Sequence, residues 1–408
     1  MKTSKFLPKI FLLISLAISH VFISCNDDEG NFEESMDIPG LTVPAKQTVF
    51  MYLPWSGSGL YYSLRENIEA FESAIENNHG TDGNALIVFI SQDNQKSNLI
   101  RIYYRDGESQ RDTLKQYDFS SCDYTEAEGI AEIINDAKAA APAEKYAMAI
   151  GCHGTGWIPV GTNVGTRAAM MNIGKNQMQQ TRYFGTGIGD NNTYQTDIAT
   201  LAEGIRETGT TMEYVLFDDC YMSNIEIAYE LKDVTKHLIA STCEIMDVGM
   251  PYERIGISLL KNNYKDIVDG FYDYYSNFST PCGTIGVTDC REVEYMAYIM
   301  QQINAAYPDL QCNITDIQDL DGFENTIFFD FGDYVSHLCS DPSLLALFND
   351  QLERLVIYKA NTETYYTSMY IAKQYPINAF SGITISDPSI NRSIANVKPQ
   401  TNWYKDTH

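Results

Sequence analysis

The chain has 408 residues, a formal net charge of -26, and 44% hydrophobic and 20% charged residues. This length can bury one large hydrophobic core or two modest ones, and the composition excludes a disordered chain. The acidic balance argues against a nucleic acid as the partner, because polyanions bind to basic surfaces.

The first 24 residues resemble the signal peptide of a bacterial lipoprotein. Lysines precede an apolar run over residues 10–23, which is too short for a comfortable membrane span. The run ends at Ser24-Cys25, which resembles a lipobox in which Cys25 is acylated and becomes the first mature residue. The acidic residues 26–29 resemble the tract that marks surface export in lipoproteins of the Bacteroidota. We therefore expect an outer-membrane lipoprotein exposed at the cell surface; an ordinary signal peptide with a chance cysteine is the alternative.

Residues 25–44 are acidic and show no periodicity, which is typical of a tether. We expect a compact core over residues 45–290, and a mostly helical region over residues 291–408 that returns one strand to this core. No internal repeat is evident, and a monomer is expected.

Apolar runs alternate with helical periodicity through the core. Short runs without polar alternation are typical of parallel strands buried on both faces, so we expect an α/β fold with a mostly parallel sheet and helices on both faces. The expected strands are Thr48–Leu53, Ala85–Ser91, Leu99–Tyr104, Tyr146–Cys152, Tyr214–Phe217, His237–Ser241 and Gly283–Thr288. The expected helices are Tyr62–Asn77, Ala127–Ala140, Thr196–Glu207 and Ser223–Leu231.

Three later stretches complete the pattern. Helical spacing predicts helices over Tyr295–Ala306 and Leu344–Ala360, and the apolar run Gly382–Ser386 predicts the strand that returns to the core.

Residues 154–195 differ from the rest, because they are rich in Gly, Asn, Gln and Thr and have no sustained period. A long irregular segment inside a compact domain is typical of a functional loop or of a mobile one.

Two of the buried strands deliver reactive side chains at their ends. Cys220 follows the run 214–217 after two carboxylates, and His153 follows the run 146–152. Reacting groups lie at the carboxyl ends of parallel strands. A lone histidine there is more often structural, but a histidine and a cysteine at two strand ends suggest a thiol nucleophile with its base. Gly154 allows close approach of the backbone, and its N–H could contribute to an oxyanion hole.

The chain contains nine cysteines. With Cys25 lipidated, eight remain, which would permit four disulfides outside the cytosol. No pair has the spacing of metal ligands such as Cys-x-x-Cys, so no metal site is expected. Cys152 and Cys243 lie in apolar strand contexts typical of buried thiols. Pairing is left open among Cys282, Cys290, Cys312 and Cys339.

The two strand ends resemble the motifs of the clostripain family of cysteine peptidases. Residues 153–157 (His-Gly-Thr-Gly-Trp) are similar to the family's His-Gly-Ser/Thr-Gly-Trp motif. Residues 217–231 resemble its Asp-Ala-Cys-Leu-Met-Ser block and the helix that follows. The order His153 then Cys220, 67 residues apart (220 minus 153), also fits. The resemblance extends from residue 46 to residue 388 or so.

The resemblance implies the α/β sandwich of the caspase-like clan and an endopeptidase that acts on proteins or peptides. It implies that Cys220 is the nucleophile, that His153 is the general base and acid, and that the N–H groups of Gly154 and Cys220 hold the oxyanion. It also implies maturation by cleavage after a basic residue between the two motifs; a solvated loop with ordinary basic residues is the alternative. The candidate processing residues are Arg167, Lys175 and Arg182.

The chain departs from the family at two positions. Asp219 stands where the family commonly has alanine, and a carboxylate beside a thiolate raises the pKa of the thiol unless the carboxylate is paired. The family aspartate that binds a basic P1 side chain corresponds to Val248, with Asp247 adjacent to it. Asp218 matches the family's other pocket carboxylate. We therefore expect substrate binding at Asp218, Asp247 and Val248, with a basic P1 preference weakened by the missing charge-assisted hydrogen bond.

No cofactor is expected. Residues 190–192 (Asp-Asn-Asn) resemble a calcium-ligand cluster only weakly, since short runs of this kind are mostly turns. The alternative to a peptidase is a non-catalytic surface binding protein on a peptidase fold, in which Asp219 and Val248 would mark lost activity. A glycan-binding lipoprotein is less favoured, because the three tryptophans outline no aromatic platform.

Overall fold

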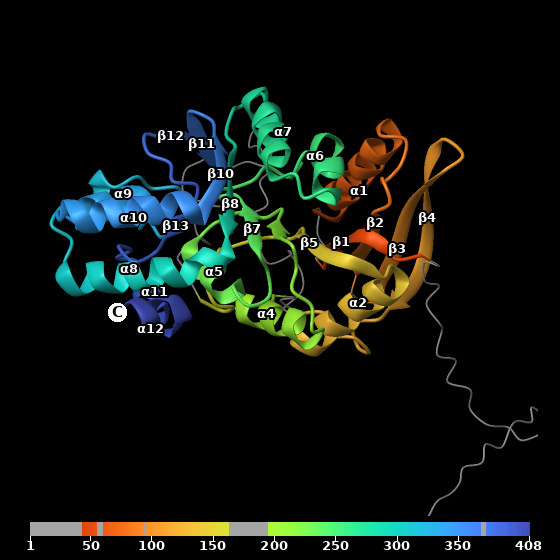
Figure 1. Cartoon of the computed structure of the whole chain (residues 1–408), viewed down its shortest axis with the longest axis horizontal. Coiled ribbons are helices and arrows are strands. Elements are labelled where there is room, and N and C mark those ends of the chain that lie inside the picture. The colour runs from red at the N-terminus through yellow and green to blue at the C-terminus, as the bar shows by residue number, and fades with distance from the viewer. Residues whose placement is uncertain (1–42, 55–59, 94, 163–194, 369–372) are drawn as a thin grey trace, which may run out of the picture. The chain divides into compact units, whose positions relative to one another are not determined.

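A mixed sheet lies at the centre of the part of the chain that the structure describes (Figure 1). The structure is a computed structural model and describes residues 43–54, 60–93, 95–162, 195–368 and 373–408. The strands of this sheet are β1 (Ala45–Leu53), β2 (Ala85–Asp93), β3 (Lys96–Arg105), β4 (Glu108–Tyr117), β5 (Ala143–Ile150), β6 (Val215–Phe217), β7 (His237–Ala240), β8 (Thr284–Asp289) and β10 (Val356–Asn361). Their order across the sheet is β10-β8-β7-β6-β5-β1-β2-β3-β4.

The middle of the sheet is parallel. Strands β2, β1, β5, β6 and β7 all run in one direction. Antiparallel pairs extend the sheet at both ends, with β3 and β4 beyond β2 and with β8 and β10 beyond β7. The carboxyl ends of the parallel strands therefore lie along one edge of the sheet, which is where reacting groups are expected in such folds.

Helices cover both faces of the sheet (Figure 1). Neighbouring residues of β1 alternate between two hydrophobic clusters, with Phe50 and Tyr52 in one and Val49 and Met51 in the other. This explains why the strand reads as an uninterrupted apolar run. One face carries α1 (Leu60–Asn77), α6 (Tyr252–Leu260) and α7 (Tyr264–Ser276). The other carries α2 (Ala127–Ala140), α4 (Ile198–Glu207), α5 (Ile225–Leu231) and α8 (Val293–Ala306). The expected mostly parallel α/β fold with helices on both faces is confirmed.

The region after residue 290 contains helices, short strands and short 3-10 turns. Besides α8, its helices are α9 (Phe331–Leu338), α10 (Pro342–Leu355), α11 (Arg392–Val397) and α12 (Asn402–Thr407). Its short strands outside the central sheet are β9 (Phe329–Asp330), β11 (Thr364–Thr367), β12 (Lys373–Pro376) and β13 (Thr384–Ile385), and its 3-10 turns are η1 (Cys290–Glu292), η2 (Ile314–Asp316) and η3 (Lys398–Gln400).

Two expectations for this region differ from the structure. The helix expected over Leu344–Ala360 is too long, because α10 ends at Leu355 and the chain continues as β10 on the edge of the central sheet. Val356, Ile357 and Tyr358 are residue types that favour a strand. The late apolar run is buried as expected, but β13 pairs with β9 in a separate two-stranded sheet. It is β10 that returns to the central sheet.

The eight cysteines from Cys122 to Cys339 are all free thiols. Cys243 is fully buried, and burial raises its pKa well above the usual value for a thiol. The cysteines whose pairing the sequence left open therefore form no disulfide in this structure.

Candidate active site

The ends of two neighbouring parallel strands bring the predicted base and nucleophile to one edge of the sheet. Ile150 of β5 is paired with Phe217 of β6. The N–H of Asp218 extends this ladder by donating to the carbonyl of Ile150 at 2.7 Å. The loop after β5 then carries His153, and the turn after β6 carries Cys220. Both residues therefore leave the sheet from adjacent strands.

The backbones of these two loops are in direct contact at Gly154. A Cβ on Gly154 would lie 2.5 Å from the carbonyl oxygen of Cys220 and 2.9 Å from the sulfur of Met222, which is closer than side-chain atoms approach one another. Further along the same loop, Gly156 has a φ of +68°, and a Cβ there would lie 2.5 Å from the ring of Phe328. Both glycines of the motif are therefore required by close approach, one to the cysteine turn and one to the C-terminal region.

The Cys220 thiol is fully buried and lies against the backbone of Ile245. The Ile245 N–H donates to the sulfur at 3.2 Å, and the sulfur lies 3.7 Å from the Ile245 carbonyl oxygen. A peptide carbonyl can reach this sulfur only after the thiol turns away from Ile245 or the Ile245 segment withdraws.

Tyr221, the residue after the cysteine, adopts a left-handed backbone conformation with φ of +62°. This conformation is unfavourable for a residue with a large side chain and persists only where contacts impose it. Its N–H donates to the Cys243 carbonyl at 3.0 Å, and its carbonyl accepts from the Asn224 amide at 2.6 Å. Its ring stacks on Phe328 with centroids 5.5 Å apart. The turn that presents Cys220 is thus held from three sides.

Glu244 contacts the same turn through its side chain, and the sequence did not predict this role. It is buried and accepts hydrogen bonds from the Tyr221 hydroxyl at 2.8 Å, the Thr367 hydroxyl at 2.6 Å and the Ser368 hydroxyl at 2.7 Å. Burial raises the pKa of Tyr221, so this phenol remains a donor. A carboxylate among apolar residues just after a strand is the signal that could have identified Glu244, because buried acids need partners.

The three residues expected to bind substrate come together beside this turn. Asp218 is fully buried, and its carboxylate accepts the N–H of Met250 at 2.8 Å. Asp247 and Val248 are half-buried. The Val248 carbonyl accepts from the Asn67 amide on α1 at 2.7 Å. Asp218 therefore fastens the segment that carries Asp247 and Val248 to the end of β6.

Asp219, the departure from the family pattern, joins the loop that carries His153 to the turn that carries Cys220. Its side chain is fully buried. One carboxylate oxygen accepts the N–H of Cys152 at 2.5 Å, and the other lies 3.5 Å from the Cys152 sulfur, which donates to it. The carboxylate beside the nucleophile is therefore paired with the residue that precedes His153.

The last residue of the histidine motif connects to the C-terminal region. The Trp157 indole donates to the Ser386 hydroxyl at 2.8 Å, and the Ser386 N–H donates to the carboxylate of Glu226 on α5 at 2.8 Å. Burial, and then the nearby Asp387 carboxylate, raise the pKa of Glu226 to about 8. No sequence pattern links these residues, because Ser386 lies 160 positions after Glu226 and 229 after Trp157.

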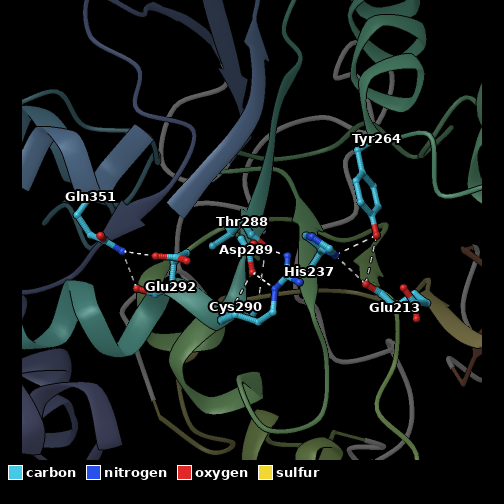
Figure 2. A network of polar contacts seen from close by, with 9 residues as sticks. Glu213, His237, Tyr264, Thr288, Asp289, Cys290, Glu292 and Gln351 are labelled. Carbon is cyan, nitrogen blue, oxygen red and sulfur yellow. Dashed lines mark hydrogen bonds and ion pairs between the residues drawn. The ribbon is translucent and has the colours of Figure 1, made fainter. Parts of the chain in front are cut away.

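A buried histidine, His237, lies at the amino ends of the parallel strands, and its polar contacts are drawn in Figure 2. It begins β7, and its Nδ1 lies 2.9 Å from both the Tyr264 hydroxyl and the Glu213 carbonyl. Burial lowers its pKa, which keeps the ring neutral. Asp289, paired with His237 across β7 and β8, accepts the N–H of Arg291 at 3.0 Å in the same network. This network lies at the amino ends of the parallel strands, whereas the predicted site residues follow their carboxyl ends.

Several predicted residues lie outside the described part of the chain. These are the lipidation residue Cys25, the candidate processing residues Arg167, Lys175 and Arg182, and the 190–192 cluster. Within the described ranges, no group of three or more His, Cys, Asp or Glu side chains is arranged to hold a metal ion. No helix among those residues has the length and apolar character needed to cross a membrane.

Comparisons with known proteins agree with this geometry. The clostripain family model matches residues 57–379. A secreted C11 cysteine protease from Bacteroides thetaiotaomicron, "iotapain", is 49% identical over 90% of this chain and 100% of its own, with a TM-score of 0.78. A clostripain from the same species, solved with a peptide inhibitor, is 54% identical over 55% of this chain and 99% of its own, with a TM-score of 0.51. An inactive zymogen C11 protease from Parabacteroides distasonis is 24% identical over 90% of this chain and 99% of its own, and its TM-score of 0.74 supports the fold. No curated protein matches the chain.

A caspase-like α/β sheet with a cysteine and a histidine at adjacent strand ends defines a class of cysteine peptidase. This chain belongs to the clostripain family. It is a cysteine peptidase, and its substrates are peptides. Family membership favours this activity over a non-catalytic binding protein on the same fold.

Proposed function

We propose that this chain is an endopeptidase that cleaves peptide bonds through Cys220 and His153. His153 takes the thiol proton, and the Cys220 thiolate attacks the scissile carbonyl carbon. The negative charge that develops on the carbonyl oxygen is held by the N–H groups of Gly154 and Cys220. The intermediate collapses to a thioester as His153 returns the proton to the leaving amine. Water, deprotonated by His153, then hydrolyses the thioester and frees the thiol.

The observation that carries this proposal is the contact between the two loops at Gly154. Because only 2.5 Å would separate a Cβ on Gly154 from the Cys220 carbonyl, the histidine loop and the cysteine turn are in backbone contact. A cysteine and histidine needed only for packing would not require this approach. The left-handed Tyr221 adds support, since residues in such conformations cluster at active sites.

Substrate choice is proposed to depend on Asp218, Asp247 and Val248. A P1 arginine or lysine would be attracted by the two carboxylates, but Val248 offers no charge-assisted hydrogen bond. We therefore propose a basic P1 preference that is moderate rather than strict. Opening the pocket to Asp218 would require release of the Met250 N–H that it now accepts.

Hydrolysis of a fluorogenic peptide library varied at P1 tests the proposal. We expect Cys220→Ala and His153→Ala each to lose more than about 1,000-fold in kcat/KM with folding intact, because the nucleophile or its base is removed. Asp247→Asn should lower the rate for arginine and lysine at P1 relative to leucine by about 10-fold.

Gels run in parallel would show whether the chain is cut after Arg167, Lys175 or Arg182, as proposed for maturation. Turnover that survives in Cys220→Ala would refute the proposed nucleophile. No turnover with any P1 residue, from either the intact or the cut wild-type chain, would refute the endopeptidase assignment.

We also propose that the enzyme works at the cell surface as a monomer, anchored in the outer membrane through a lipid on Cys25. The basis is the sequence of residues 1–29, in which an apolar run ends at Ser24-Cys25 and acidic residues follow. Metabolic labelling with a fatty acid should mark the wild-type protein but not Cys25→Ala, and protease added to whole cells should digest the wild type. A label that persists in the variant would exclude Cys25 as the anchor.

A further inference from the structure

We propose that Asp219 is a positioning residue for the Cys220–His153 pair, one that locks the histidine loop to the cysteine turn through a hydrogen bond. This inference rests on the proposed catalytic roles of Cys220 and His153. It assigns a role to a residue that stands where the family commonly has alanine.

The contact joins the two residues that immediately precede the reactive ones. Asp219 precedes Cys220, Cys152 precedes His153, and the Cys152 N–H donates to the Asp219 carboxylate at 2.5 Å. The neighbouring residue Gly154 closes the same junction, because a Cβ there would lie 2.8 Å from the Cβ of Asp219. The histidine loop is therefore fixed to the cysteine turn on both sides of His153.

Position matters here because a general base acts only when it is held at the right place relative to its nucleophile. Before His153, the Gly151 N–H donates to the Tyr52 carbonyl of β1 at 3.1 Å, which continues the sheet pattern. After His153, the Trp157 indole donates to the Ser386 hydroxyl. The Asp219 bond lies between these two contacts and ties the histidine loop to the turn that carries the proposed nucleophile. A shift of about 1 Å at a reacting group can lower the rate by about 100-fold.

The buried environment makes this bond strong and its geometry demanding. Asp219 is fully buried, and a carboxylate that accepts a backbone N–H there is worth more than the same pair in water. If the Asp219 carboxylate acted through its charge alone, activity would survive a small displacement of its oxygens. If it acts through this hydrogen bond, activity survives loss of the charge but not displacement of the accepting oxygen.

Two substitutions separate these cases. In Asp219→Asn the amide oxygen can still accept the Cys152 N–H and the amide NH2 faces the sulfur, so we expect kcat within about 5-fold of wild type. Asp219→Glu keeps the charge but moves the oxygen by about one methylene, so we expect kcat to fall about 100-fold. Asp219→Ala removes the acceptor, so we expect its kcat also to fall about 100-fold. KM should stay within about 3-fold in all three, because the Asp218–Met250 contact at the pocket is untouched.

Asp289→Asn is the matched control. Asp289 is another buried carboxylate that accepts a backbone N–H, at 3.0 Å from Arg291 (Figure 2). It is paired with His237 at the amino ends of the parallel strands, whereas His153 and Cys220 follow carboxyl ends. We expect it to lower the melting temperature and leave kcat unchanged.

The inference is overturned if Asp219→Ala, folded, keeps the wild-type kcat, or if Asp219→Asn is as slow as Asp219→Glu. Should the alanine and glutamate variants fail to fold, Asp219→Asn still decides, because the proposal requires it to fold and to turn over. Failure of the catalytic assignment itself would instead show as activity in Cys220→Ala.

Discussion

Gly154 is the residue at which the two halves of the proposed site meet. Its missing side chain leaves room for the Cys220 carbonyl on one side and for Asp219 on the other. The neighbouring atoms belong to backbone and to a buried side chain, so they cannot easily move aside. The requirement for glycine at 154 is therefore steric and comes from the tertiary contact.

We expect Gly154→Ala to lower kcat/KM by at least about 100-fold, because the added methyl group pushes the histidine loop away from the cysteine turn. Gly332→Ala on α9 is the matched control, since a Cβ there would lie 3.2 Å from its nearest side-chain atoms and the helix favours alanine. Peptide hydrolysis and thermal melting of both variants test this. Wild-type kcat/KM in Gly154→Ala would contradict the contact.

At the same scale, the sequence predicted the placement of some residues and not of others. The placement of His153 and Cys220 at neighbouring strand ends could be predicted because each follows an apolar strand. The contact between the Asp218 carboxylate and the Met250 N–H could not be predicted, since it depends on a segment 32 positions away. Phe328, which contacts both Gly156 and the ring of Tyr221, carries no signal in its own stretch of sequence.

Among the elements, the central strands and the amphipathic helix α2 were predicted most closely. The helix Ala127–Ala140 and the strands β1, β2, β5 and β7 lie within a few residues of their expected bounds. β4 (Glu108–Tyr117) was not predicted, because it is polar on both faces and gives no alternation. It forms because Asp106 and Gly107, both at positive φ, turn the chain back onto β3.

The cysteine turn shows how elements combine to present a reactive group. The strand β6 contributes only three residues before Cys220, and α5 begins soon after at Ile225. The Asn224 side chain caps α5 by accepting the Ile227 N–H, while its amide holds the Tyr221 carbonyl. One side chain therefore fixes both the start of the helix and the left-handed turn.

For the molecule as a whole, the C-terminal region is tied to the site through Glu226. Its carboxylate accepts the Ser386 N–H, and Ser386 also accepts from Trp157 of the histidine motif. Helix α12 packs against α5 and α8, which closes this side of the core. The stability of this junction should depend on pH, because burial raises the pKa of Glu226 from its usual 4.5 to about 8.

The direction of the Glu226 pKa shift determines how stability changes with pH. The folded protein holds the Glu226 proton more tightly than the unfolded chain does, so this contribution to stability is complete below pH 4.5 and is lost as the pH rises through about 8. Glu226→Gln keeps an oxygen to accept the Ser386 N–H and needs no proton. We expect the variant to be more stable than wild type by about 2 to 4 kcal/mol at pH 8.5 and by much less at pH 5.

Denaturant unfolding of both proteins between pH 5 and pH 8.5 measures this difference. His237 contributes a slope of opposite sign, because burial lowers its pKa and its contribution is lost as the pH falls below 6.5. Both proteins contain His237, so its effect cancels in the comparison. A gap between variant and wild type that does not change with pH would rule out a raised pKa at Glu226.

The sequence by itself determined the fold class and the family, and it placed the proposed reactive pair at neighbouring strand ends, since strand periodicity and the residues at strand ends are local features. Tertiary structure decided what holds that pair in place. Asp219 meets Cys152 across 67 positions, Tyr221 meets Glu244 across 23, and Ser386 reaches both Trp157 and Glu226 from the end of the chain. Such contacts follow from the packing of the whole core, because a buried polar group must find its partner wherever the fold supplies one.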